Sequence, residues 1–136
     1  MNIRVTWKES SPADRIILVI YILAFAGATF NHVSDLVEFG FFPYSAMYGV
    51  PAFMNIYWTA LTLLDPLAIL VLLLHVRRGC LFYLAIMLSD VTINLFAEIK
   101  YWKQPLTESY GLILQVAFLL FLLFTFSRFM KKGKPA

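Results

Sequence analysis

Basic residues are missing from a long part of this chain of 136 residues. No Lys or Arg occurs between Ile16 and Val76, where the only formal charges are the acids Asp35, Glu38 and Asp65. Charged residues make up 14% of the chain and hydrophobic residues 61%, whereas a soluble domain carries about 25% charged residues. A soluble domain of this length leaves about 30% of its unfolded surface exposed. These shortages therefore exclude a soluble enzyme and a disordered chain.

Several motifs are also absent. Cys80 is the only cysteine, which excludes a disulfide framework and a paired-cysteine redox site. The chain has no glycine-rich phosphate loop, no G-x-S-x-G nucleophile and no G-x-x-x-G helix-dimerisation motif. The basic residues lie at segment ends and form no stripe, so no nucleic-acid partner is expected.

Four apolar stretches are each long enough to cross a bilayer as a helix, which takes about 20 residues. Lipid offers no partner to backbone N–H and C=O groups, so helices are required, and the leucine-rich runs lack the alternation of barrel strands. We therefore predict an all-α fold, with one membrane domain over residues 1–136 that forms a four-transmembrane-helix bundle in the lipid bilayer. The predicted spans are about Ile16–Glu38, Phe53–His75, Cys80–Ile99 and Ser109–Phe129.

Basic residues predict the orientation of this bundle. Of the 11 Lys and Arg residues, only Lys100 and Lys103 follow the third span. By the positive-inside rule both termini are then cytoplasmic, and we expect the protein in the inner (plasma) membrane of a bacterium. The basic residues on the predicted cytoplasmic side are Arg4, Lys8, Arg15, Arg77, Arg78, Arg128, Lys131, Lys132 and Lys134.

The first outer loop, Phe39–Ala52, carries no charge and is rich in aromatic residues, Gly and Pro. Such a segment suits the membrane interface or a dip back into the membrane. The simpler interpretation is an aromatic belt at the interface, and the alternative is a lid over a site. We interpret Trp7, Tyr101, Trp102 and Tyr110 as interface anchors.

Polar residues recur at helical spacing inside the first three spans. Asp90, Asn94 and Glu98 are four residues apart and so share one face of the third span. A charge at the bilayer centre costs about 2.5–3.5 kcal/mol, so polar faces should pack together rather than face lipid. We expect an acidic pocket that opens outward. Its predicted ligand-binding residues are His32, Asp35, Trp58, Thr62, Asp65, Asp90, Asn94 and Glu98.

Other residues should shape this pocket. Pro66 has no N–H to donate to the Thr62 carbonyl, so we expect the second span to kink beside Asp65. Aromatic side chains are expected to form the walls together with Trp58. These are Phe30, Phe53, Tyr57 and Phe96.

The same polar residues also have a purely structural interpretation. Asp65 and Asp90 would then hydrogen-bond across helices, one or both protonated, because burial disfavours a charged carboxylate. His32 would be an interhelical donor. The other histidine, His75, lies at the far end of the second span, so the two cannot jointly ligate one haem, although each could serve a separate one. We expect no metal and no cofactor.

The chain bears two resemblances to known groups of membrane proteins. The segment from Trp58 through Asp65-Pro66-Leu-Ala, followed by Ser89-Asp90-Val91 and Asn94, resembles a pattern in small bacterial four-helix membrane proteins. As architecture, the whole chain is similar to the EXPERA superfamily, which includes sterol Δ8–Δ7 isomerases and the sigma-2 receptor. That resemblance implies an acidic membrane cavity that binds hydrophobic amines or stabilises a carbocation. It assigns no catalytic residue here.

Three functions fit these observations. The leading hypothesis is binding or transport of a small amphipathic or cationic ligand, with Asp65 or Asp90 exchanging protons or pairing with it. Four helices are few for a transport path, so a homo-oligomer is expected. The alternatives are an EXPERA-like isomerase or sterol- or lipid-binding protein, and an accessory subunit of a larger membrane complex. Access from two sides would indicate transport, whereas a side opening without a cytoplasmic exit would indicate an enzyme.

Overall fold

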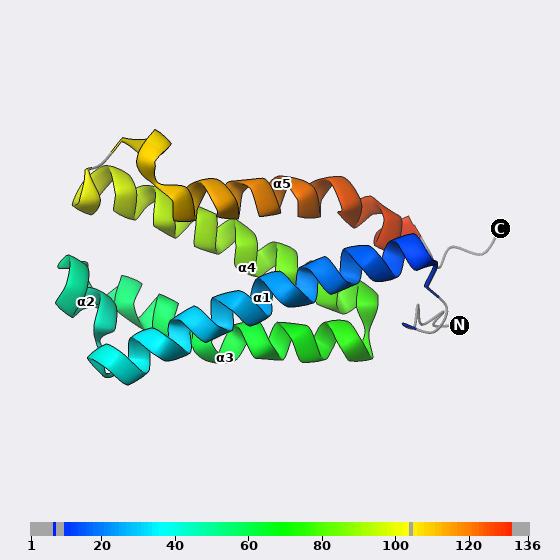
Figure 1. Cartoon of the computed structure of the whole chain (residues 1–136), viewed down its shortest axis with the longest axis horizontal. Helices are drawn as coiled ribbons and strands as arrows, with labels where there is room; N and C mark the ends of the chain where they lie inside the picture. The colour runs from blue at the N-terminus through cyan, green and yellow to red at the C-terminus, as the bar shows by residue number, and fades with distance from the viewer. Residues whose placement is uncertain (1–6, 8–9, 104, 132–136) are drawn as a thin grey trace.

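The structure is a computed structural model of the chain, described for residue 7 and for residues 10–103 and 105–131. Over these residues it is all-α, and four long apolar helices pack as a bundle, which confirms the predicted fold class (Figure 1). Each is long and apolar enough to cross a membrane, α4 together with the π-helical turn η2 that extends it. The long helices are α1 Pro12–Phe39, α3 Ala52–Leu74, α4 Val76–Ala97 and α5 Tyr110–Lys131. The short ones are α2 Pro43–Tyr48, η2 Glu98–Trp102 and the 3-10 turn η3 Leu106–Glu108.

The two ends of the bundle differ. Figure 1 shows α1 beginning and α5 ending at one end, which we call the terminal end. The opposite end carries α2, η2 and η3, and we call it the α2 end. Four of the basic residues that predict orientation, Arg4, Lys8, Lys132 and Lys134, lie outside the described residues.

The start of α1 is fixed by its cap. The Ser11 side chain accepts a hydrogen bond from the backbone N–H of Asp14, and the Asp14 carboxylate accepts one from the backbone N–H of Ser11. Pro12 occupies the first helical position, where its missing N–H costs nothing. Gly40 ends the helix with a positive φ of 77°. The helix is therefore one turn longer at its start than the predicted span.

A single residue, His75, separates α3 from α4. The expected cytoplasmic loop is shorter than predicted, because α4 already begins at Val76. Close packing accompanies this turn: a Cβ atom on Gly79 would lie 2.3 Å from the Cα atom of Leu72. The backbones of α3 and α4 therefore touch near the terminal end.

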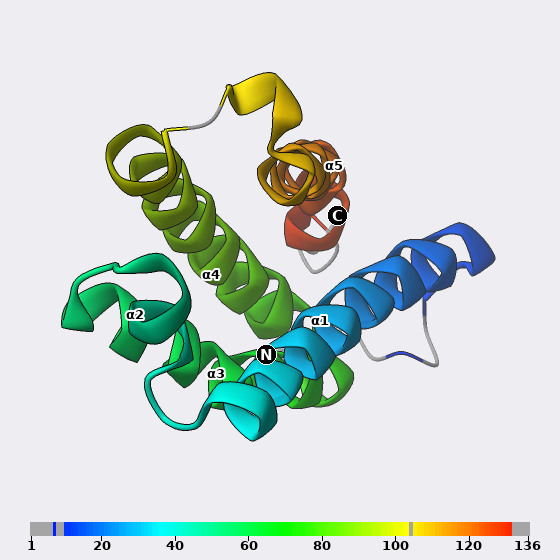
Figure 2. The same ribbon diagram turned by 60° about the vertical axis from the view of Figure 1, so that its left-hand side comes forward.

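The helices pack in chain order. The main contacts join α1 with α3, α3 with α4, and α4 with α5. Side chains of the first and last helices, α1 and α5, meet toward the terminal end, and the two helices are well separated at the α2 end (Figures 1 and 2). Large apolar side chains cover the outside of the bundle, as lipid contact requires; Phe124, for example, is 87% exposed.

A candidate ligand-binding cleft between α1 and α5

A cleft with three sections runs from the α2 end to the middle of the bundle. The mouth section holds about 760 Å³, the central section about 170 Å³ and the lateral section about 470 Å³. Neighbouring sections share lining residues, so the sections adjoin one another. The mouth and central sections share Tyr48, Asn94, Trp102 and Gln115. The central and lateral sections share Asn31, His32, Asp90 and Gln115.

Aromatic rings line the central section. Its lining includes four of them, on α2, α3 and η2. The Trp58 and Trp102 rings are stacked, with their centroids 6.0 Å apart. Each also contacts a tyrosine ring in an edge-to-face arrangement, with the two ring centroids 5.1 Å apart. Those tyrosines are Tyr44, against Trp58, and Tyr48, against Trp102.

The short helix α2 is held over the cleft by one buried side chain of α3. The Asn55 Oδ1 atom accepts hydrogen bonds from the backbone N–H groups of Tyr44 and Ser45, at 2.9 and 3.2 Å. Asn55 Nδ2 donates to the carbonyl of Phe41 at 3.1 Å. Asn55 is 1% exposed, so water cannot compete for these hydrogen bonds. Part of the charge-free loop therefore covers the cleft.

A chain of polar groups leads from α2 to the middle of α3. The Tyr44 hydroxyl lies 2.7 Å from His32 Nδ1, and His32 Nε2 lies 3.9 Å from an Asp65 carboxylate oxygen. Burial, followed by the charge of Asp35, raises the pKa of Tyr44, so this phenol keeps its proton. His32 thus links α2 to a carboxyl group that is 2% exposed.

The second carboxyl group belongs to α4. Asn94 Nδ2 donates to Asp90 Oδ1 at 3.1 Å and to Gln115 Oε1 at 2.7 Å. The amide of α5 and the carboxyl group of α4 are therefore tied together through one asparagine. Asp90 lines both the central and the lateral section. It is 8% exposed and shares the lining of the lateral section with Asp65.

The lateral section opens sideways between α1 and α5. Its rim includes Leu23 of α1, which is 65% exposed, and Leu114 of α5, which is 70% exposed. Its lining also includes the buried acids Asp65 and Asp90. Exposed leucines on transmembrane helices face lipid tails, so the acids are approached through an apolar rim in the plane of the bilayer.

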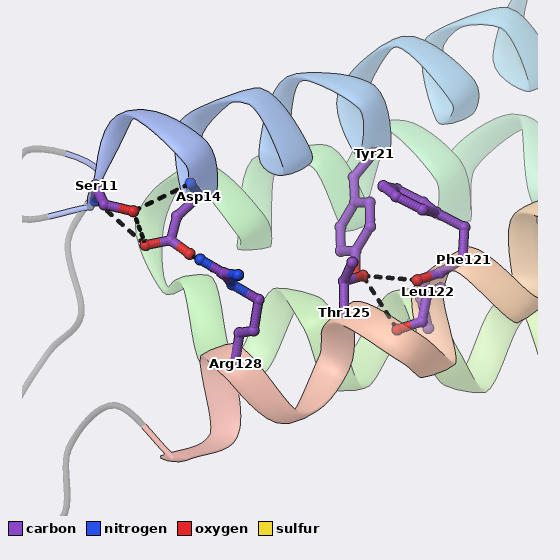
Figure 3. Close-up of polar contacts among 7 residues, drawn as sticks. All are labelled: Ser11, Asp14, Tyr21, Phe121, Leu122, Thr125 and Arg128. Atoms are coloured by element: carbon purple, nitrogen blue, oxygen red, sulfur yellow. Dashed lines mark hydrogen bonds and ion pairs between the residues drawn. The ribbon is translucent and has the colours of Figure 1, made fainter.

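Over the residues that the structure describes, side-chain contacts close the terminal end of the same two helices (Figure 3). The Tyr21 hydroxyl of α1 hydrogen-bonds to Thr125 of α5 at 2.5 Å, and Arg128 Nε lies 3.2 Å from the Asp14 carboxylate. The Tyr21 ring also stacks on Tyr83, with ring centroids 5.6 Å apart. Packed aromatic rings and an ion pair therefore separate the cleft from the terminal end.

The mouth is shaped by the π-helical turn at the end of α4. Its hydrogen bond from the Lys103 N–H to the Glu98 carbonyl, at 2.8 Å, spans five residues rather than four. Such turns often mark functional sites. Here the turn brings Trp102 over Trp58. Glu98 is 2% exposed and accepts a hydrogen bond from Ser109, so it is not a solvated surface acid.

The structure brings most of the predicted site residues together and leaves one aside. Thr62 lies outside the three sections, and its buried Oγ1 atom has no hydrogen-bond partner in the described part of the chain. The predicted residues that line the cleft are His32, Asp35, Trp58, Asp65, Asp90, Asn94 and Glu98.

The prediction of the aromatic residues that form the pocket walls, apart from Trp58, is wrong. Phe30 is 71% exposed and Phe53 58% exposed, so both face outward. Phe96, also exposed, carries the Lys100 ammonium group over its ring. Tyr57 hydrogen-bonds to Ser89 instead of lining the cleft.

Sequence reasoning missed several cleft residues. Gln115 is an amide within the apolar last span, and this signal could have identified it as a site residue. Trp102 was interpreted as an interface anchor, but it packs inside the cleft. The missed lining residues with polar or aromatic side chains include Asn31, Tyr44, Tyr48, Trp102 and Gln115.

The fold and this cleft define a polytopic membrane protein with four transmembrane helices and buried carboxyl groups. Comparison with protein-family models, curated proteins and solved structures finds no match for the chain. Within the described ranges, no group of three or more His, Cys, Asp and Glu residues could hold a metal ion.

Proposed function

We propose that this protein binds a small amphipathic cation, a hydrophobic amine in the broad sense, which enters the cleft from the bilayer between α1 and α5. The observation that carries this proposal is the lateral section, where exposed leucines form a rim and Asp65 and Asp90 are part of the lining. The apolar tail of the ligand would remain at the rim. Its charged group would lie near Asp90, where the lateral and central sections meet.

Charge supports a cationic rather than an anionic ligand. Among the described residues, the linings of the three sections contain the acids Asp35, Asp65, Asp90, Glu98 and Glu108 and no Lys or Arg. An anion in this cleft would meet like charges in a medium of low dielectric constant. A cation would instead be attracted to these carboxylates, as the guanidinium group of an arginine is in a buried ion pair.

Closure of the terminal end favours binding over passage through the bundle. The bond between Tyr21 and Thr125 and the ion pair of Asp14 with Arg128 block the route along the α1–α5 seam. The proposed orientation has the α2 end outside and the terminal end in the cytoplasm of a bacterial cell. A ligand would then enter from the bilayer or from the outer face.

The same closure supports an isomerase as a second candidate. A protonated carboxyl group beneath an apolar rim can give its proton to an alkene carbon, and a neighbouring base can remove a proton from the adjacent carbon. Asp65 and His32, 3.9 Å apart, are such a pair. Incubation with a Δ8 sterol tests this candidate: the Δ7 product has the same mass as the substrate, and gas chromatography separates the two by retention time.

The binding proposal is tested in micelles of an uncharged maltoside detergent. Dodecyltrimethylammonium and dodecylammonium are titrated against the protein, with dodecanol as the uncharged probe of equal tail length. The fluorescence of Trp58 and Trp102, which line the central section, reports binding. We expect saturable binding of at least one cation and none of the alcohol beyond its partition into micelles.

A variant identifies the carboxyl group involved. Asp90→Asn keeps an oxygen that can accept the hydrogen bond from Asn94 but removes the charge. Interactions with a charged group contribute about 1.5–3 kcal/mol, so the dissociation constant should rise about 10- to 100-fold. The matched control is Glu38→Gln, because Glu38 is exposed and lines none of the three sections. Equal binding of the alcohol and both cations, or equal losses in the two variants, would refute the proposal.

A further inference from the structure

We infer that the charged group of the ligand is a quaternary ammonium, such as a trimethylammonium head, seated among the aromatic rings of the central section. This inference rests on the proposed function and narrows it, because a hydrophobic amine of any kind would satisfy the binding proposal. Its basis is the juxtaposition of Tyr44, Tyr48, Trp58 and Trp102 around one small cavity that also has Asp35 and Asp90 in its lining.

Aromatic rings recognise methylated ammonium groups through the negative potential of their faces. A trimethylammonium group has no N–H and is weakly hydrated, so it loses little when water is replaced by rings. A primary ammonium group brings three N–H donors, and rings offer them no strong acceptor. Because four aromatic side chains contribute to the lining, the section favours the methylated group.

The ring geometry suits a compact cation. Trp58 and Trp102 are nearly parallel, with 15° between their planes, while Tyr44 and Tyr48 stand at 62° and 63° to the tryptophan that each contacts. The four rings therefore do not lie in one parallel stack. The cavity of about 170 Å³ corresponds to about five or six water molecules at about 30 Å³ each. A trimethylammonium group with its attached carbon has a similar number of heavy atoms.

Charge neutralisation comes from the acids beside the rings. Asp90 lines the central section and also the lateral section, so it stands beside the path from the head group to the tail. The lateral section continues to the apolar rim at Leu23 and Leu114, with Phe118 also in its lining. One molecule with a cationic head and a single aliphatic tail would therefore occupy both sections.

An unpaired donor gives a second, independent indication. The indole Nε1 atom of Trp102 is buried and has no hydrogen-bond partner among the described atoms. A buried unsatisfied donor is costly, and an oxygen close to the ammonium group of the ligand would satisfy it. A hydroxyl or ester oxygen two carbons from the nitrogen, as in choline derivatives, has this chemistry.

The test compares head groups on one tail in maltoside micelles. Phosphatidylcholine bilayers are avoided, because their own trimethylammonium heads would compete for the site. We expect the wild-type protein to bind dodecyltrimethylammonium about 10-fold more tightly than dodecylammonium, the factor of a partly desolvated cation–π contact. Equal or tighter binding of dodecylammonium would overturn this inference and leave the binding proposal standing. Failure of both cations to bind better than dodecanol would overturn both.

Two substitutions at Tyr48 locate the effect. Tyr48 is 48% exposed, so its replacement leaves the packed interior intact. Tyr48→Leu removes the ring and should weaken dodecyltrimethylammonium binding about two- to fivefold, with little change for dodecylammonium. Tyr48→Phe keeps the ring face and should bind like the wild type. An equal loss for both probes in Tyr48→Leu, or a loss in Tyr48→Phe as large as that in Tyr48→Leu, would contradict the seat among the rings.

Discussion

The contact of Gly79 with Leu72 gives the sharpest stability prediction. A Cβ at residue 79 would lie 2.3 Å from the Leu72 Cα atom and 2.7 Å from its backbone nitrogen. Backbone atoms cannot rotate away as a side chain does. Ordinary contact begins at 3.4 Å, so Gly79→Ala must push α3 and α4 apart by about 1.1 Å in an interior that tolerates few gaps.

The expected magnitude follows from this geometry. Overpacking costs about 1–3 kcal/mol, and a backbone obstruction places this variant at the upper end. At this chain length 1 kcal/mol shifts the melting temperature by about 4 °C. We therefore expect Gly79→Ala to melt about 10 °C below the wild type, measured by thermal unfolding in maltoside micelles.

The control makes the same chemical change at Gly27 of α1, where an added Cβ would meet no atom within 4 Å. Alanine is a better helix former than glycine by up to about 1 kcal/mol. Gly27→Ala should therefore melt at the wild-type temperature or up to about 4 °C above it. If the two variants shift the melting temperature equally, or Gly79→Ala is neutral, the backbones of α3 and α4 do not touch as described.

Gly79→Ala should also weaken binding of the cation. Asp65 lies about two turns before Leu72 and Asp90 about three turns after Gly79, so both carboxyl groups lie on the α2 side of this contact. Separating the helices there changes the spacing of the two acids. The titration with dodecyltrimethylammonium measures this effect on the fraction of protein that remains folded.

Two further predictions concern the terminal end and the short helix α2. Arg128→Gln removes the cation beside the fully buried Asp14 carboxylate. It should lower the melting temperature by about 4–8 °C, because breaking an ion pair whose arginine is half exposed costs about 1–2 kcal/mol. The control is Lys131→Gln at the same helix end, which should change the melting temperature by less than about 2 °C. Asn55→Ala leaves backbone groups around α2 unpaired, so amide exchange there should accelerate at least about 10-fold. The control Thr59→Ala loses only a 3.4 Å contact and should leave that exchange unchanged. Exchange as slow in Asn55→Ala as in the wild type would contradict the role of Asn55 in holding α2.

The architecture was accessible from the sequence because the bilayer imposes a simple rule on length and polarity. Four apolar runs of about 20 residues predict four helices, and the spacing of Asp90, Asn94 and Glu98 predicts a shared face. All three side chains are buried. Each of these signals is local, so none requires knowledge of how the helices pack.

The walls of the cleft were not accessible for a physical reason. In a membrane helix, lipid and protein interior are equally apolar, so the sequence does not distinguish a phenylalanine that faces lipid from one that faces the cleft. Phe30 and Phe53 were assigned to the wrong side for this reason. Tyr44 and Trp102 depend on tertiary contacts, with Asn55 and with the π-helical turn, that no local pattern encodes.

The order in which the helices pack has a consequence for how the protein is made. Because α3 packs on α1, α4 on α3 and α5 on α4, each later span has its packing partner already in the chain when it is synthesised. Asp65 and Asp90 can therefore find each other before the last span has been synthesised. The seam between the first and last spans closes only afterwards, and it is the seam along which the cleft opens to the bilayer. Biogenesis thus finishes the scaffold of the cleft first and its entrance last.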